Sequence, residues 1–570
     1  MHSDMTTQTV PDMTAPSGDK RSSTHSLPVS ILQCTVLLAL CSCILFVNIG
    51  GWELYNPDEP RYAEVAREMM KTGNYIVPRL GSELYARKPP FFFWLIALCS
   101  LPRNDVDSFS ARLPSAVAAL GVILLTFLLG KMLFDPLTGF LAGLILFTGI
   151  EFFWLATRAH LDMTLTFWIT LAQFLLYCGY VRAPGSRRLY ACAFFCTGLA
   201  ILTKGPVGII IPLLTISLFL LIRREFIRFR DLKPGTGLLI AAGTTALWLV
   251  PACIMGGAEY SRDILFKETF GIIKNSFSHQ EPFYFYLLHF PKDFLPWTLF
   301  IPAAALYFWR CRRAGEPFHL LFPLVWFLGG FIFLSCISKK RNLYLLTLYP
   351  AAALVMAGFW CAAIRSGKAA LHDRLANFIM VPLYLFFGAL VLCSLVFFIA
   401  VPLKLAFAAF LQPAGTAVFI ILAFALAAGI AGIALTAKRS SVPALFAMVI
   451  ITMMGLFFCI VVTVLPAIDE GKAMRTFLSS VEKAVPPGNT LAFYRIDQSL
   501  FYFLSRDPVP EIRDYALLGK TLESSNAFFC LMQEKNYLNA PAEIQKLLTV
   551  LCEGMYANQK YVLVTKPPVQ

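Results

Sequence analysis

The chain has 570 residues, of which 58% are hydrophobic and 14% are charged, and its formal net charge is +14. A water-soluble domain carries about 25% charged residues, so this composition excludes one large soluble core and indicates that lipid surrounds most of the chain. The net positive charge does not indicate nucleic-acid binding, because the lysines and arginines lie mostly in short loops between apolar runs. That distribution is typical of membrane proteins that obey the positive-inside rule.

The N-terminal residues 1–28 are rich in serine, threonine and proline, and they predict a disordered cytoplasmic tail. The first apolar run, 29–50, is too long for a signal-peptide core, so we expect it to remain as a membrane anchor. Together with later runs it predicts a membrane domain over 29–466 with about 13 transmembrane helices. The predicted helices lie near 29–49, 112–133, 138–157, 162–181, 189–203, 206–222, 237–255, 294–310, 318–335, 343–363, 378–401, 414–436 and 442–465.

The apolar run 91–101 is too short to cross a bilayer, because about 11 helical residues reach only about 16 Å, roughly half of the hydrocarbon core. If this run does not cross, every basic loop after it falls on the cytoplasmic side, as the positive-inside rule requires. We therefore expect 91–101 to be half-embedded or interfacial. The segments then expected on the external side are the first loop 51–111, the turns 158–162, 204–206 and 339–344, the loop 256–291 and the C-terminal tail.

The first external loop begins with Asp58-Glu59-Pro60, which is typical of a helix start because acids in the first turn complement the helix dipole. An amphipathic helix is predicted to continue through Lys71 along the membrane surface. Asp58 is therefore either a helix cap or a functional acid. Lys88, which precedes two prolines, either reaches along the interface as a structural lysine or binds a phosphate at the membrane boundary.

Isolated charges mark the later external turns. Asp162 begins an apolar run as a cap or a site residue, with Arg158 as its expected partner. Lys204 and the cluster Lys339–Arg341 are expected on the side opposite the basic loops. Their charge breaks the positive-inside pattern there, and it suits the binding of an anionic ligand. His279 is either a structural histidine or a ligand.

The tail 467–570 has the composition of a small α/β domain rather than of a membrane segment. Strands are predicted at Leu491–Arg495, Phe528–Met532 and Tyr561–Thr565, and helices at Arg475–Ala484, Gln498–Leu504 and Ala542–Leu551. Cys530 and Cys552 either form a disulfide there or stay as two thiols.

Several motifs, taken in order, resemble those of dolichyl-phosphate-mannose protein mannosyltransferases and bacterial lipid A aminoarabinose transferases. They are NPDEPRYAEVAREM, GNYIVPRL, LYARKPPFFFW, ARLPSAVAAL, ATRAHLDMTLTFW, ILTKGPVG, HQEPFYFYL and KKRNLYLLTLYPAAAL, over about residues 30–365. The segment FYRIDQSLFYFLSRDPV is similar to the soluble domain of the aminoarabinose transferases. The ordered set is more specific than any single motif.

The resemblance implies a GT-C fold: a mainly α, polytopic bundle with interfacial helices in the first external loop and a small α/β C-terminal domain. It also implies catalysis on the extracytoplasmic face with a polyprenyl-phosphate-linked sugar donor. The residues matched to catalytic positions are Asp58 and Asp162. Those matched to the donor-phosphate site are Arg61, Tyr85, Lys88, Lys204 and Tyr344.

The resemblance further implies a divalent metal such as zinc at His279. Family members commonly carry Glu directly before the lysine of Lys-Pro-Pro, whereas this chain has Arg87. One histidine alone makes a poor zinc site, so Glu83 or Glu281 is the alternative second ligand.

The predicted function is transfer of a sugar, with 4-amino-4-deoxy-L-arabinose as the candidate, from undecaprenyl phosphate to lipid A. We expect a monomer in the bacterial inner membrane, with the active site and the C-terminal domain in the periplasm and no nucleic-acid partner. One alternative is a related transferase that acts on a protein or another glycan. A second is a transporter of a lipid-linked substrate, against which the absence of a visible inverted repeat counts. A scaffold protein that binds through its tail is the third.

Overall fold

The computed structural model describes most of the chain. The described residues are 23–55, 57–81, 83–181, 186–267, 281–313, 319–367, 375–405, 408, 415–486, 489, 491–496, 498–504, 511–524, 528–556 and 559–566. His279 lies outside them. Helix α1 (Ser23–Phe46) begins six residues before the predicted anchor, so the prediction of a disordered tail to residue 28 is wrong for 23–28.

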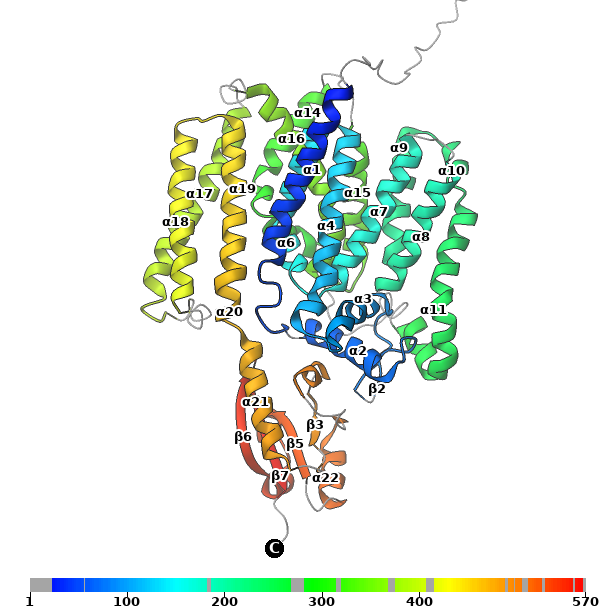
Figure 1. The fold of residues 1–570 in the computed structure, drawn as a ribbon, viewed down its shortest axis with the longest axis vertical. Coiled ribbons are helices and arrows are strands. Elements are labelled where there is room, and N and C mark those ends of the chain that lie inside the picture. Colours follow the sequence, from blue (N-terminus) through cyan, green and yellow to red (C-terminus); the bar gives the residue numbers. More distant parts are fainter. Residues whose placement is uncertain are drawn as a thin grey trace, which may run out of the picture.

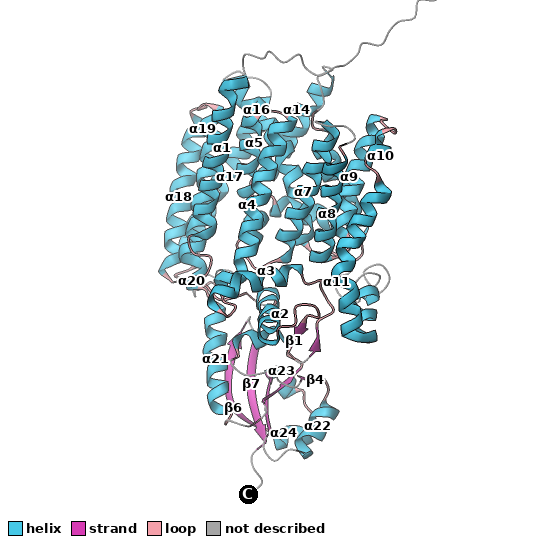
Figure 2. Cartoon of the chain, turned by 45° about the vertical axis from the view of Figure 1, so that its right-hand side comes forward, coloured by secondary structure: helices cyan, strands magenta, loops and turns pink. Residues whose placement is uncertain are grey.

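A bundle of long apolar helices forms the larger part of the molecule (Figures 1 and 2). Every stretch predicted to span the membrane coincides with a helical segment, and within the described residues eight segments are long and apolar enough to cross a bilayer. The number is nine if α5 and α6, which meet at a bend of 73°, count as one span. The predicted polytopic, mainly α fold is therefore confirmed.

The bundle contains further helices after α1. They are α4 (Ser108–Leu133), α5 (Pro136–Phe147), α6 (Ile150–Ala156), α7 (Leu161–Val181), α8 (Arg187–Lys204), α9 (Val207–Arg223), α10 (Arg228–Asp231), α11 (Pro234–Arg262), η2 (Asp263–Lys267), α13 (Phe285–Asp293), η3 (Trp297–Phe300), α14 (Ile301–Arg313), α15 (Leu321–Cys336), η4 (Asn342–Leu348), α16 (Tyr349–Ser366), α17 (Leu375–Ala400), α18 (Thr416–Ala437), α19 (Val442–Cys459), η7 (Ile460–Val464) and α20 (Leu465–Ala467).

Close backbone contact holds the first helices of the bundle together. A Cβ atom on Gly139 of α5 would lie 2.4 Å from the Phe127 carbonyl oxygen, and one on Gly130 of α4 would lie 2.7 Å from the Gly139 Cα. Apolar burial gives little drive between helices in lipid, so small residues that let backbones approach supply the packing energy instead. These two glycines fix the α4–α5 pair.

The two ends of the bundle differ in character. The connections α9–α10 and α18–α19, which contain Arg224 and the pair Lys438–Arg439, lie at the upper end in Figure 1. The first loop lies at the lower end as α2 (Asp58–Thr72), the β1–β2 hairpin (Arg79–Leu80, Glu83–Leu84), α3 (Phe91–Ser100) and η1 (Leu101–Arg103). The C-terminal domain lies below the same end.

Helix α2 is covered on two sides instead of lying only on a membrane surface. Its apolar residues share one core with α3 and with the C-terminal domain. The Arg67 guanidinium donates hydrogen bonds to the carbonyls of Tyr502 (2.8 Å) and Val106 (3.0 Å) and stacks 4.4 Å from the Tyr502 ring. The C-terminal domain thus packs directly against α2, the helix that begins at Asp58.

The C-terminal domain contains a five-stranded sheet of order β4-β3-β5-β7-β6. Strands β3, β4 and β5 are parallel, whereas β7 pairs antiparallel with both β5 and β6. The elements are α21 (Glu470–Ala484), β3 (Leu491–Tyr494), η8 (Gln498–Phe503), β4 (Glu511–Ile512), α22 (Tyr515–Ser524), β5 (Phe528–Gln533), α23 (Glu534–Leu538), α24 (Ala542–Leu547), β6 (Thr549–Tyr556) and β7 (Gln559–Lys566).

Two expectations for this domain need correction. The helix predicted over 542–551 ends at Leu547, because the next residues pair with β7 as strand β6. Cys530 lies on β5 and Cys552 on β6, and β7 separates these strands by about 9–10 Å, beyond disulfide reach. Both cysteines are free thiols.

Candidate active site

Glu59 is the centre of a buried hydrogen-bond cluster at the lower end of the bundle. The Arg112 guanidinium donates to both its oxygens at 2.9 Å, and Arg158 lies 3.4 Å away. The backbone N–H groups of Ala159 and Tyr55 donate to it at 2.6 and 2.7 Å. Burial would raise the pKa of Glu59, but Arg112 and then Arg158 and the Ala159 N–H lower it to about 2.

Arg112 extends this cluster into the chain between α1 and α2. Its guanidinium donates to the carbonyls of Ile49, Trp52 and Glu53 and lies 4.6 Å from the Trp52 ring centroid. The side chain is fully buried. With every donor engaged, the Glu59–Arg112 pair fixes the position of α2 on α4.

Asp58, the adjacent residue, faces different partners. Arg341 donates to one oxygen at 2.9 Å, and Arg61 to the other at 3.3 Å. The His160 Nε2 lies 3.6 Å from Asp58. Helix α2 has no side-chain cap hydrogen bond, and Pro57 occupies its N-cap position, so the capping alternative for Asp58 is wrong.

The ionisation of Asp58 follows from these partners. Burial would raise its pKa, but hydrogen bonding and charge from His160 and then Arg341 outweigh burial and hold the pKa well below its usual range. Asp58 is therefore a carboxylate at every physiological pH. Such a group orients cations and polar ligands well and is a weak proton acceptor.

Asp162 lies in the first turn of α7 and is almost fully buried. The His160 Nδ1 lies 3.0 Å from one oxygen, and the Lys204 ammonium forms an ion pair with the other. Arg158, the partner expected from the sequence, instead contacts Glu59 because the turn carries its side chain toward α4. The prediction of an Arg158–Asp162 pair is wrong.

Lys204 is the last residue of α8. Gly205 follows with φ +90°, a left-handed conformation that favours glycine. The helix therefore ends at Lys204. The Lys204 Nζ lies 4.0 Å from the Tyr344 ring centroid. Lys88 and Arg341 are within electrostatic range of Lys204, so three cations gather beside the acid pair.

The remaining predicted residues line the same region from α2 and the first loop. Tyr85 is buried against Phe93, with ring centroids 5.8 Å apart. Tyr62, not selected from the sequence, packs edge-on to His160 at 5.9 Å and lies within electrostatic range of Asp58, Asp162 and Tyr85. The fold brings Asp58, Arg61, Tyr85, Lys88, Asp162, Lys204 and Tyr344 to one end of the bundle.

His160 is the connecting residue that the sequence analysis overlooked. It is buried between Asp58 and Asp162 and contacts both carboxylates. Burial would lower the pKa of His160, but Asp162 and Asp58 raise it above its ordinary value. Its position two residues before Asp162, in an external turn, was the available signal.

Of the predicted metal ligands, the structure describes Glu83 and Glu281 but not His279. Glu83 forms an ion pair with Arg513 of the C-terminal domain. Among the described residues, no three His, Cys, Asp or Glu side chains form a group that could hold a metal ion. His279 lies outside those residues, so a metal there stays a prediction, and no chemistry is derived through it.

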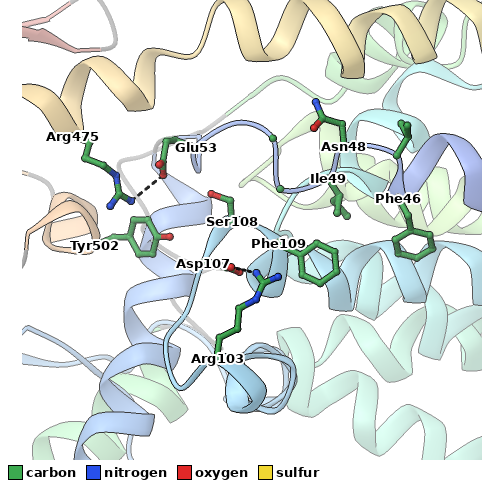
Figure 3. A pocket seen from close by; sticks show the side chains of 13 residues that line it. Phe46, Asn48, Ile49, Glu53, Arg103, Asp107, Ser108, Phe109, Arg475 and Tyr502 are labelled. Carbon is green, nitrogen blue, oxygen red and sulfur yellow. Dashed lines mark hydrogen bonds and ion pairs between the residues drawn. The ribbon is translucent and has the colours of Figure 1, made fainter.

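A separate cavity of about 610 Å³ lies at the junction with the C-terminal domain. Figure 3 shows Arg475 reaching Glu53 across it and Arg103 paired with Asp107 on the other side. None of the predicted site residues lines this cavity. Its charged residues are already paired, so it separates the two domains without joining the Asp58 cluster.

Comparison with known proteins gives a partial match to one family model, two relatives and two solved structures of similar fold. Residues 30–265 match the family model described as dolichyl-phosphate-mannose-protein mannosyltransferase. An uncharacterized protein of Aquifex aeolicus is 30% identical over 320 residues, which are 55% of this chain and 61% of that protein. The undecaprenyl phosphate-alpha-4-amino-4-deoxy-L-arabinose arabinosyl transferase 2 of Proteus mirabilis is 27% identical over 338 residues, 58% of this chain and 60% of that protein. The matches thus span about 60% of the length of these two relatives.

Solved structures extend the likeness to nearly the whole chain. A crystal structure of ArnT from Cupriavidus metallidurans bound to undecaprenyl phosphate superposes with a TM-score of 0.73 at 19% identity, covering 96% of this chain and 98% of that one. The Archaeoglobus fulgidus oligosaccharyltransferase gives a TM-score of 0.52 at 13% identity, covering 94% of this chain and 75% of that one. The predicted resemblance is thus confirmed as a similarity over residues 30–265, and the chain shares its predicted helical membrane fold with these solved structures.

Proposed function

We propose that this chain, whose residues 30–265 match a mannosyltransferase family, is an integral membrane glycosyltransferase that uses an undecaprenyl-phosphate-linked sugar to modify lipid A. The proposed sugar is 4-amino-4-deoxy-L-arabinose, which the name of the Proteus mirabilis relative contains. The observation that carries the proposal is the cluster of carboxylates and cations at one end of a membrane bundle, where Asp58, Asp162, Lys204 and Arg341 meet.

The arrangement of charges supports a site on the periplasmic face of the inner membrane. The basic α9–α10 and α18–α19 connections lie at the end opposite α2 and the C-terminal domain (Figure 1). Positive loops stay on the cytoplasmic side of a membrane, so the Asp58 cluster would face the periplasm. A polyprenyl donor and lipid A both present their phosphates at that boundary.

In the proposed reaction an acceptor phosphate oxygen attacks the anomeric carbon of the donor sugar. The new oxygen–carbon bond forms as the bond from that carbon to the donor phosphate breaks, and the bonding pair leaves with undecaprenyl phosphate. Lys88, Lys204 and Arg341 are the cations available to neutralise the leaving phosphate. Their contribution is large because the site is mostly buried and poorly hydrated.

The low pKa of Asp58 favours a phosphate acceptor over a hydroxyl acceptor. A hydroxyl would need a base to take its proton, whereas a phosphate is already largely ionised near neutral pH, with a second pKa of about 6. Asp58 would then hold Arg341 and orient the sugar or the acceptor. His160 would link Asp58 to Asp162, so that the two acids act from fixed positions.

The direct test is purified full-length protein in lipid nanodiscs with undecaprenyl-phosphate aminoarabinose and lipid A. Mass spectrometry should show one added aminoarabinose on a lipid A phosphate. Asp58→Asn serves as the negative variant, and Asp514→Asn, an exposed acid of the C-terminal domain, is the matched control. Modification of a peptide or another glycan instead of lipid A would overturn the proposed acceptor.

The transporter alternative makes a different prediction for the same sample. A transporter would move the intact donor across the bilayer and release no free undecaprenyl phosphate. The transferase releases one undecaprenyl phosphate for each sugar attached. Donor movement without this product would overturn the proposal of an enzyme. Elemental analysis of the same preparation tests the separate prediction of a zinc ion at His279.

A further inference from the structure

Two buried acids outside the proposed transfer machinery lie next to each other near the active site. Glu151 is in the short helix α6 and is 8% exposed, and Asp293 ends α13 and is 6% exposed. The Asn342 amide donates to Glu151 at 3.1 Å and is within hydrogen-bonding reach of Asp293. Neither acid forms an ion pair with a residue that the structure describes.

The pair also has unsatisfied polar atoms around it. The Asp293 Oδ2 and the Tyr349 hydroxyl are buried and have no hydrogen-bond partner within the described ranges. Tyr349 is 1% exposed and lies within electrostatic range of both acids. Lys292, an exposed residue of α13, is within electrostatic range of both acids, and His160 and His289 are within range of Glu151 and Asp293, respectively.

Such an arrangement is costly without a further partner. A buried polar atom with no hydrogen bond costs roughly 1–3 kcal/mol, and two carboxylates side by side disfavour each other's ionised form. Two buried acids this close disfavour a double negative charge, so the pair either keeps a proton or binds a positively charged group. A ligand that brings one positive charge and several N–H donors would satisfy Glu151, Asp293 and Tyr349 together.

The position of the pair relative to the proposed catalytic residues points to the sugar. Asn342 directly follows Arg341, which binds Asp58, so the two side chains start from Cα atoms about 3.8 Å apart. Glu151 is within electrostatic range of His160 and Asp162. The acid pair therefore lies beside the Asp58 cluster, where the proposed donor sugar would bind.

We propose that Glu151, Asp293 and Tyr349 form a subsite that binds the protonated amine of an amino sugar on the donor. The inference rests on the proposed transferase function and adds the residues that select the substrate class. A primary ammonium has three N–H donors, one for each of these side chains. A sugar with a hydroxyl in place of the amine brings no charge and would leave the carboxylates unbalanced.

The test compares two donors that differ only at this position, undecaprenyl-phosphate aminoarabinose and undecaprenyl-phosphate arabinose. Wild-type protein in nanodiscs should prefer the amino donor about 10- to 100-fold in kcat/KM, the range expected for a charge-assisted hydrogen bond. In Glu151→Gln and Asp293→Asn this preference should fall to about threefold or less, mainly through a higher KM for the amino donor. Transfer from the arabinose donor should change little.

A second variant and a matched control keep the outcome clear. Tyr349→Phe removes only the unpartnered hydroxyl and should lower the preference several-fold while the melting temperature holds. Glu225→Gln changes an acid at the opposite end of the bundle, where it pairs with Arg223 and Arg228, and should leave the preference intact. An unchanged preference in Glu151→Gln and Asp293→Asn, or an equal loss on both donors, would overturn the subsite.

Donor binding separates this inference from the proposed function. Native mass spectrometry of the same nanodiscs measures the binding of each donor without acceptor. If the protein binds the amino donor more tightly through Glu151 and Asp293 but transfers nothing to lipid A, the subsite stands and the transferase proposal fails. If transfer occurs with equal binding of both donors, the subsite fails alone.

Discussion

Glu59 and Asp58 are neighbours on one helix, yet they occupy opposite kinds of environment. Glu59 accepts hydrogen bonds from Arg112, which is buried with every donor engaged, and from the backbone N–H groups of Ala159 and Tyr55. Asp58 pairs with Arg341, which is 37% exposed in its side chain, and with a histidine shared with a second acid. We therefore expect the first carboxylate to hold the fold and propose the second as the one that acts on a ligand. The role of each carboxylate is therefore indicated by the residues it contacts and not by its position in the sequence.

The largest loss of stability should come from breaking the buried hydrogen-bond cluster around Glu59. Arg112→Met leaves Glu59 as a buried charge without its main partner, which costs roughly 3–5 kcal/mol of folding free energy. Thermal unfolding in detergent should show a sharply lower Tm, and activity should fall with the folded fraction. Glu59→Gln should behave similarly. A normal Tm with lost activity in Glu59→Gln would mean that both carboxylates serve catalysis.

Asp58→Asn should separate activity from stability. We expect transfer to fall about 10²- to 10³-fold, the cost typical of losing one preorganised electrostatic group, while the Tm stays within a few degrees of wild type. The measurement is the initial rate of sugar transfer to lipid A, with Tm on the same preparation. A wild-type rate in Asp58→Asn would show that Asp58 has no part in the mechanism. Only the structural role of Glu59 would then remain from the comparison.

A third acid of α2, Glu68, should show the opposite pH dependence from Glu59. Burial and then the charge of Glu64 raise the pKa of Glu68 to about 7. Between about pH 4.5 and 7 the folded chain holds a proton here that the unfolded chain has released, so stability falls as pH rises through this window. Glu68→Gln removes that loss, on the order of 1 kcal/mol. Its Tm should exceed that of wild type at pH 8 and match it near pH 5, and equal pH slopes would contradict the prediction.

The smallest effect is expected at the cavity between the domains. Arg475→Ala breaks a pair with Glu53, and Arg103→Ala breaks one with Asp107, and both arginine side chains are more than half exposed. Exposed pairs contribute about 0–1 kcal/mol, so each variant should shift Tm by only a few degrees. A loss as large as that of Arg112→Met would show that the domain junction, and not the Glu59 cluster, holds the first loop.

Much of this molecule could be predicted from local sequence. Apolar length and loop charge located the spanning segments, and the short run 91–101 is the short helix α3. The motifs also selected residues that the fold brings to one end. Pairings between distant segments could not be predicted: Arg158 binds Glu59 across the chain, and His160 joins two acids. Strand β6 was missed because pairing with β7, and not local preference, decides it.

The buried Arg112 also constrains how the protein is made. It is the fifth residue of α4, and its guanidinium meets carbonyls of the preceding linker and the carboxylate of Glu59. An arginine left within lipid costs roughly 2.5–3.5 kcal/mol during insertion. All of its partners in this network are synthesised before α4 itself. We therefore expect folding of the first loop to favour insertion of α4, because both needs are met by residues that precede this helix in the chain.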